Sequence, residues 1–179
     1  GGFKNVKIIN NKGYNTFRSA ITIQSVDGGI CENILVDSLY ATNVGNAIYL
    51  IVGNRRQYAG SMRNITIRNL YCEVAAAKPD AGYDYEGPIE DNPRNISPSQ
   101  IIGLPDSKID SVFLENITII YPGGGDPFIA HIGLNELDKV PEMPTAYPEF
   151  SQFKELPAWG FYIRHARNIF FKNVIISAL

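Results

Sequence analysis

The sequence predicts an all-β solenoid of about five stacked coils with two long loop insertions, and three observations predict it. A seven-residue template recurs five times, and a second apolar run precedes four of the five copies. The copies also lie about 30 residues apart wherever no insertion separates them. The 10 Tyr, 9 Phe, 16 Gly and 11 Pro agree with this, because they favour strands and turns over long amphipathic helices.

The five copies of the template share one pattern of apolar and polar positions. They are NVKIINN from Asn5, NILVDSL from Asn33, NITIRNL from Asn64, SVFLENI from Ser111 and NIFFKNV from Asn168. Counting the first residue as zero, offsets one and three are apolar in every copy, and offset six is apolar in all but the first, which has Asn11. Apolar residues at every second position predict a strand with one buried face.

Offset five of the template is always a small polar residue. The residues there are Asn10, Ser38, Asn69, Asn116 and Asn173. Asn tolerates unusual backbone dihedrals and bonds to the backbone, so this position is predicted to be a corner. Stacked Asn side chains can also form a ladder from one coil to the next.

The second apolar runs and the spacing of the copies complete the coil. The runs are AITIQS at 20–25, NAIYLIVG at 46–53, SQIIGLP at 99–105 and GFYIRHA at 160–166. The template starts are 28, 31, 47 and 57 residues apart (5 to 33, 33 to 64, 64 to 111, 111 to 168), which places insertions at 75–98 and 123–157. We expect both insertions to project from one side of the solenoid, where such insertions often line a binding face.

A β-sandwich is the alternative fold, but it requires hairpin signals between alternating strands. Asp27-Gly28-Gly29 is the only near match, so the sandwich is disfavoured. We expect residues 1–179 to be a single β-helix domain. Neither end of the sequence offers an amphipathic cap, so we interpret the chain as part of a longer β-helix with open ends that could self-associate.

Charge and composition exclude several classes of partner. The formal net charge is -2, so no basic excess is available for nucleic acid. No apolar stretch approaches the roughly 18 residues that a membrane span needs. Cys31 and Cys72 each lie at the edge of an apolar run and are expected to be small buried hydrophobes, with a disulfide as the weaker alternative. Metal-ligand spacing is absent, so neither a metal nor a cofactor is predicted.

Long blocks of the sequence resemble a known family. These blocks are RSAITIQSVDGGICENILVDSLYATNVGNAIYL at 18–50, KPDAGYDYEGPIEDNPRNISPSQIIGLPDS at 78–107, LENITIIYPGGG at 114–125 and YPEFSQFKELPAWGFYIRHARNIFFKNV at 147–174. They resemble the bacterial branch of the polygalacturonase-like glycoside hydrolases, family 28. The resemblance implies a right-handed parallel β-helix that hydrolyses pectic polysaccharide by inversion with aspartate catalysts. It also implies a secreted, periplasmic or cell-surface location.

The catalytic motifs of that family are missing from this chain. The family's Asn-Thr-Asp, Asp-Asp and Gly-His-Gly motifs do not occur, and Asn15-Thr16 is followed by Phe17. The family's Arg-Ile-Lys strand aligns with Thr22-Ile23-Gln24, so a charged grip on a uronic acid is lost at Gln24 unless another residue such as Arg18 supplies the cation. The catalytic residues are therefore unknown and are expected on coils outside this chain.

Substrate-binding candidates come from the outward positions of the second apolar runs and from nearby turns. They are Gln24, Tyr49, Arg55, Tyr162, Arg164 and His165. Arginine pairs with carboxylates, and tyrosine stacks on sugar rings. The alternative is a solvated strand face for Tyr162 and Arg164, a structural or exposed role for His165, and a solvated turn for Arg55. Tyr83, Asp84, Tyr85 and Glu86 form a further candidate patch in the first insertion. None of the outward strand residues is a carboxylate, so no acid/base pair about 6.5–9.5 Å apart is predicted.

The sequence is therefore interpreted as the C-terminal part of a hydrolase acting on a pectin-like polymer, galacturonan or rhamnogalacturonan. One alternative is a carbohydrate-binding β-helix without catalysis, which the missing motifs also fit. The other is a structural solenoid that assembles through its open ends.

Overall fold

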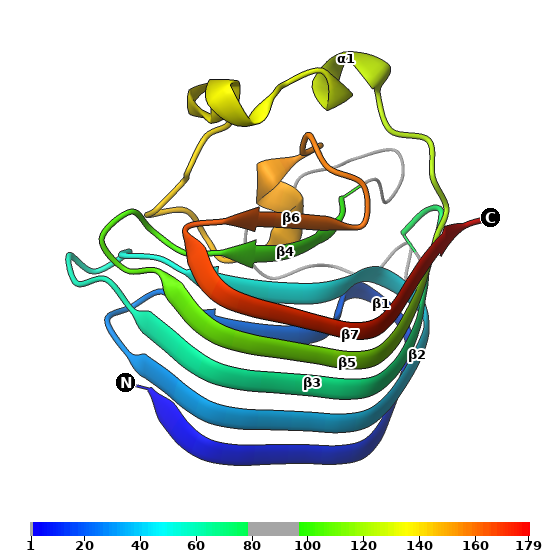
Figure 1. Cartoon of the computed structure of the whole chain (residues 1–179), viewed down its shortest axis with the longest axis horizontal. Helices are drawn as coiled ribbons and strands as arrows, with labels where there is room; N and C mark the ends of the chain where they lie inside the picture. The colour runs from blue at the N-terminus through cyan, green and yellow to red at the C-terminus, as the bar shows by residue number, and fades with distance from the viewer. Residues whose placement is uncertain (1, 79–96) are drawn as a thin grey trace.

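The computed structural model describes residues 2–78 and 97–179, and their architecture is all-β with parallel strands. The strands are β1 (Phe3–Ser25), β2 (Ile30–Val52), β3 (Ser61–Val74), β4 (Ser99–Ile102), β5 (Ile109–Tyr121), β6 (Phe161–Arg164) and β7 (Ala166–Ala178). The helices are short: α1 (Pro127–Ala130) and the 3-10 turns η1 (Leu134–Lys139) and η2 (Phe150–Phe153). Figure 1 shows the strands as a stack of bent layers.

The strands pair in two parallel stacks that share β1 and β2. The template stack runs β1-β2-β3-β5-β7 and holds all five template copies. The second stack runs β1-β2-β4-β6 and holds the four second apolar runs. Ile34 pairs with Ile65, and Ile65 pairs with Val112, so the template copies lie in the register that their shared pattern predicts.

The apolar template positions fill an inner core between the two stacks. Offsets one and three are almost fully buried in the three middle copies: Ile34, Val36, Ile65, Ile67, Val112 and Leu114 are each at most 2% exposed. Ile48, Leu50 and Ile101 of the second stack belong to the same core. In the outer copies these positions are more open, and Phe171 on β7 is 47% exposed. The predicted alternation is therefore confirmed, with its burial strongest in the middle of the stack.

The predicted corners are confirmed by the backbone dihedrals. All five residues at offset five have φ between 52° and 61°, in the left-handed region where Asn is tolerated best. Offset zero is a corner as well, since Asn5, Asn33, Asn64, Ser111 and Asn168 have φ between 55° and 59°. The sequence interpretation did not identify this second corner.

Amide ladders run along both corners, as the stacking of Asn predicts. At offset zero the side chain of Asn64 donates to Asn33 over 2.7 Å, and Asn33 donates to Asn5 over 2.9 Å. At offset five Asn173 donates to Asn116 over 2.9 Å, and Asn116 donates to Asn69 over 3.1 Å. Each bond joins neighbouring layers and satisfies amide groups at the bend.

Serine interrupts each ladder once, and the preceding aspartate takes its place. Ser38 and Ser111 are too short to reach the next layer. Asn69 therefore donates to Asp37 over 2.8 Å, and Asn168 donates to Asp110 over 2.8 Å. The Arg68 guanidinium and the Asn69 amide hold the pKa of Asp37 below its usual value, and the Asn168 amide and Arg167 do the same for Asp110.

Both cysteines are free and buried, which confirms the prediction made for them. Cys31 is 1% exposed and Cys72 is 0% exposed, and both belong to the inner core. Burial raises the pKa of the Cys72 thiol to about 12, so it stays a thiol at neutral pH.

Residues 123–157, the second predicted insertion, cover the outward face of the second stack. In Figure 1 this segment (yellow to orange) arches over β4 and β6. It forms an outer cluster with the strands, which consists of Phe17, Val26, Tyr49, Ile51, Ile102, Tyr162, Val140, Phe150 and Leu156. The first insertion, 75–98, lies mostly outside the described residues.

Candidate functional site

The outer cluster buries the two tyrosines that were predicted to bind substrate, Tyr49 and Tyr162. The side chains of Tyr49 and Tyr162 lie on the outward side of their strands, as the alternation predicts. They are nevertheless only 1% and 5% exposed. Val140, Phe150 and Leu156 of the insertion cover them, and the rings of Phe17 and Phe150 lie 5.4 Å apart. Tyr162 therefore presents no open face for a sugar, and Tyr49 is accessible only as part of the wall of a pocket next to Gln24. Their outward orientation was predictable, whereas their burial required knowledge of where the insertion packs.

Arg164 and His165 hold the insertion against the strands. The Arg164 guanidinium donates to the carbonyl of Val140 over 2.8 Å and pairs with the Glu142 carboxylate over 2.9 Å. His165 Nε2 lies 2.6 Å from the same carboxylate. The Arg164 side chain is 12% exposed and the Glu142 side chain 30%, so the pair is only partly shielded from water. We refer to these three side chains, Glu142, Arg164 and His165, as the Glu142 clip.

Arg55 also has partners within the chain. Its Nε lies 3.9 Å from Asp27 Oδ1, and its guanidinium lies 5.4 Å from the centre of the Tyr147 ring. The second contact is a cation–π interaction that joins the turn after β2 to the insertion. Arg55 therefore resembles Arg164 in attaching the insertion to the strand face.

Gln24 lies in a pocket of about 400 Å³ between β1 and the insertion, which we call the Gln24 pocket. Its Nε2 donates to the carbonyl of Pro148 over 2.6 Å. Arg18, which could replace the missing cation, lines the same pocket and forms an ion pair with Glu149. Glu149 is 4% exposed, so the pair is largely buried at its acidic end, while the Arg18 side chain is 36% exposed. Tyr49, Tyr147 and Thr22 also line this pocket, so two of the predicted site residues, Gln24 and Tyr49, meet here.

The Gln24 pocket contains side chains that can form hydrogen bonds, and it contains a carboxylate that the strand pattern did not predict. Glu149 comes from the insertion, so no analysis of strand faces could have found it. Among the described lining residues it is the one acidic group, and its partner is Arg18. Acid/base hydrolysis requires two carboxylates on opposite sides of the scissile bond. The described lining of the Gln24 pocket has one carboxylate and therefore no such pair.

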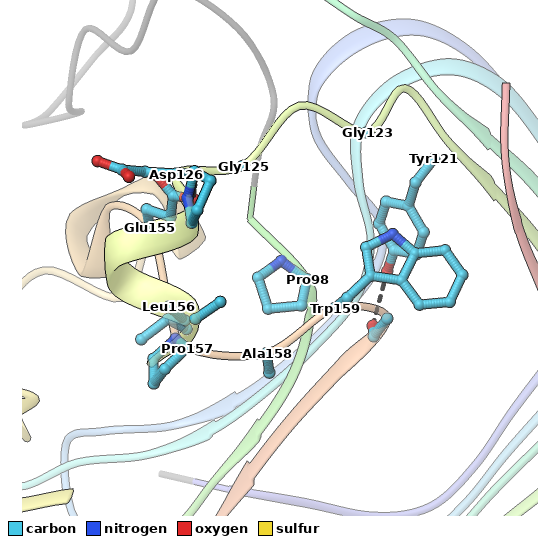
Figure 2. A pocket seen from close by; sticks show the side chains of 13 residues that line it. Pro98, Tyr121, Gly123, Gly125, Asp126, Glu155, Leu156, Pro157, Ala158 and Trp159 are labelled. Carbon is cyan, nitrogen blue, oxygen red and sulfur yellow. Dashed lines mark hydrogen bonds between the residues drawn. The ribbon is translucent and has the colours of Figure 1, made fainter. Parts of the chain in front are cut away.

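A second pocket, of about 330 Å³, lies where the two ends of the insertion meet, and the sequence interpretation placed no site residue there. Figure 2 shows Trp159 and Tyr121 at one side, Asp126 and Glu155 at the other, and Pro98 between them. We call it the Trp159 pocket. The sequence offered one signal for it, since Trp159 is the single tryptophan of the chain and follows an insertion.

No metal centre emerges from the part of the chain that the structure describes. Within residues 2–78 and 97–179, no group of three or more His, Cys, Asp or Glu side chains is placed to bind a metal ion. The same residues include no helix that is both long and apolar enough to span a membrane. The candidate patch Tyr83, Asp84, Tyr85 and Glu86 lies outside the described residues.

Comparison with protein-family models, with curated proteins and with solved structures finds no match for this chain. The family relationship therefore stays a hypothesis that depends on the sequence blocks quoted above.

Proposed function

We propose that this chain is a right-handed parallel β-helix of about five coils that forms part of the substrate cleft of a glycoside hydrolase. The substrate would be a pectin-like polymer, a galacturonan or rhamnogalacturonan, and the enzyme would act outside the cytoplasm. The parallel stacking of the template copies is compatible with such a solenoid. The observation that carries the functional proposal is the Gln24 pocket.

The Gln24 pocket supports the proposal because of what it brings together. A guanidinium, an amide, a threonine hydroxyl, a tyrosine ring and a carboxylate line one pocket of about 400 Å³. Polar groups of this kind fix the orientation of a ligand, and the volume is within the usual range of ligand sites, about 300–1,000 Å³. The pocket also lies at Thr22-Ile23-Gln24, where the family resemblance predicts contact with the substrate.

In this proposal the chain binds and orients the polymer, and the aspartate catalysts lie on coils outside it. Arg18 and Gln24 would donate hydrogen bonds to the sugar, and Tyr147 would contact its ring. Arg164 and Tyr162 would act indirectly, by holding the insertion that supplies Tyr147 and Glu149, whereas Tyr49 lines the pocket itself.

A non-catalytic carbohydrate-binding module is the second candidate, because Glu149 is the single carboxylate among the described residues of the pocket. A structural solenoid that self-associates is the third, and the exposed apolar residues Phe170, Phe171 and Ile175 of β7 favour it.

The test is calorimetric binding of galacturonic acid hexamer to the chain, together with an assay of reducing ends released from pectic polymers. We expect saturable binding without product release. Arg18→Ala should weaken binding by about 10-fold or more, because a hydrogen bond to a charged group is lost. Gln24→Met, which keeps the length of the side chain, should weaken it less.

Arg63→Ala is the matched control, since Arg63 lies on the template stack and pairs with Glu32 instead. Equal weakening by Arg63→Ala, or no binding of any pectic oligomer, would remove the Gln24 pocket from consideration. Product release by the chain alone would show that it contains a complete acid/base pair. Self-association without any glycan affinity would favour the structural solenoid.

A further inference from the structure

Trp159 is exposed at the surface, but the residues on both sides of it in the chain are fixed by packing or hydrogen bonds. Its side chain is 59% exposed, although a tryptophan offers more apolar area for burial than any other residue. On one side Leu156 is buried in the outer cluster, and on the other Gly160 accepts hydrogen bonds from the Tyr121 hydroxyl over 2.9 Å and from the Ser99 amide over 2.8 Å. Gly160 has φ 86°, a conformation that favours glycine and turns the chain sharply after Trp159.

Tyr121 supports the tryptophan from beneath. Its ring lies 6.4 Å from that of Trp159 at 56°, and its hydroxyl also bonds to the Ser99 side chain over 2.8 Å. Tyr121 is 4% exposed, so it forms the wall of the pocket and Trp159 forms the accessible surface. Figure 2 shows the Trp159 ring next to that of Tyr121, and a dashed line marks the hydrogen bond of the Tyr121 hydroxyl.

The opposite end of the Trp159 pocket is acidic. Glu155 accepts a hydrogen bond from the backbone amide of Asp126, and the Asp126 side chain accepts one from the amide of Phe128 over 2.9 Å. A Cβ on Gly125 would lie 2.6 Å from Glu155 Oε1, so glycine there allows the carboxylate its close approach to the backbone. The described lining residues include no Lys, Arg or His.

We infer that the Trp159 pocket binds a neutral saccharide unit. An exposed indole gives the apolar face of a sugar ring a flat surface, and carboxylates accept strong hydrogen bonds from sugar hydroxyls. The apolar middle of the pocket, with Pro98 and Ala158, lies between these two ends. A uronic acid fits poorly, because its carboxylate would meet Asp126 and Glu155 with no cation among the described lining residues.

This inference does not rest on the proposed pectic cleft. The Trp159 pocket and the Gln24 pocket share no lining residue. They also differ in charge, since the Gln24 pocket has a guanidinium and the Trp159 pocket has none among the described residues. One chain would therefore bind a charged polymer at one place and neutral sugar at another.

The single tryptophan makes the test direct, because selectively excited tryptophan emission then comes from this pocket alone. The full chain is titrated with neutral tetrasaccharides of galactose, glucose and xylose, and with tetragalacturonic acid of the same length. We expect at least one neutral tetrasaccharide to change the Trp159 emission saturably. Tetragalacturonic acid should bind this pocket at least about 10-fold more weakly.

Variants measured by calorimetry separate binding from folding. Glu155→Gln keeps an acceptor for the Asp126 amide but loses the charge, and it should weaken the neutral sugar by about 10-fold. Trp159→Ala should abolish binding, whereas Trp159→Phe should retain it because an aromatic face remains. Circular dichroism is used to check that each variant is folded. Arg63→Ala, on the template stack and outside both pockets, is the control that should leave neutral-sugar binding unchanged.

Three results would overturn the inference. One is the absence of fluorescence change and heat with every neutral tetrasaccharide at concentrations on the order of 10 mM. Another is stronger Trp159 quenching by tetragalacturonic acid than by the neutral sugars. The third is displacement of the sugar by low concentrations of spermidine, which would indicate an amine site. Loss of galacturonide binding with neutral-sugar binding intact would instead count against the proposed function alone.

Discussion

The inner core and the outer cluster are both apolar and both buried, yet they are built in different ways. The inner core repeats from layer to layer, since Ile34, Ile65 and Val112 occupy equivalent positions on paired strands. The outer cluster joins strand residues such as Tyr49 and Tyr162 to Phe150, which comes from an irregular segment. The repeated template specifies the inner core, whereas single polar contacts hold the outer cluster in place. The comparison shows that an outward strand face is not an open one when a long insertion can fold back on it.

The largest effect is expected from a cavity in the inner core. Leu114→Ala, at a position that is 1% exposed, should lower the free energy of unfolding by about 2–5 kcal/mol. Urea denaturation followed by circular dichroism measures the change. A fall in the free energy of unfolding below about 1 kcal/mol would mean that the layers close around the cavity. The inner core would then be packed no more tightly than the outer cluster.

A cavity in the outer cluster should act locally. Phe150→Ala removes a ring that packs on Phe17 and lies over the second stack, so residues 134–157 should detach more readily than the strands unfold. Hydrogen exchange should rise in this segment, while the free energy of global unfolding should fall by less than in Leu114→Ala. Equal exchange throughout the strands and the insertion would show that the two regions unfold as one unit.

Removing the cation of the Glu142 clip should have a smaller local effect. Arg164→Ala leaves Glu142 without its guanidinium partner and should destabilise the attached insertion by about 1–3 kcal/mol. Hydrogen exchange around residues 137–145 measures this loss. Galacturonide affinity should fall less than in Arg18→Ala. A larger fall would restore Arg164 as a direct contact to a uronic acid.

The aspartates of the ladders should give a modest dependence of stability on pH. The pKa values of Asp37 and Asp110 are lowered from an ordinary value of 3.8 by partners that exist only in the folded chain. Their contribution is therefore present above about pH 3.8 and is lost as the pH falls toward the lower folded values. Urea denaturation at several pH values between about 2 and 6 should show the decline.

Asp37→Asn is the variant that sharpens this measurement, because it keeps an acceptor for Asn69 and removes the charge beside Arg68. Its stability should depend less on pH in the acidic range than that of the unaltered chain. An unchanged acid dependence would mean that other carboxylates are responsible.

The sequence predicted the inner core and its register because the template constrains every layer in the same way. Shifting a strand by one residue would turn Ile65 and Ile67 out of the core, so the apolar pattern alone selects the pairing. The corner at offset five followed from Asn chemistry. The corner at offset zero was missed, although Asn5, Asn10 and Asn15 recur at five-residue intervals and all have φ between 53° and 57°.

The site was less predictable because it depends on the insertion. The roles of Arg164 and Arg55 follow from Glu142 and Tyr147, which lie 22 and 92 residues away along the chain (142 to 164, 55 to 147). No periodicity relates such residues, since each contact is formed once. Gln24 was predicted to contact substrate, which stays a prediction; it does line a pocket, but its carboxylate neighbour Glu149 could be found only from the folded chain.

The ladders at the corners make the register of the strands independent of the length of the segments that connect them. Side-chain amides fix each layer over its neighbour, while the segments that join the layers begin and end outside them. Template starts can therefore be 28 or 57 residues apart without a change in the register of their strands (5 to 33, 111 to 168). A protein engineer could exploit this by exchanging residues 123–157 for an unrelated loop. The scaffold should accept such a transplant wherever the new loop covers, or replaces with polar residues, the outward apolar side chains of the second stack.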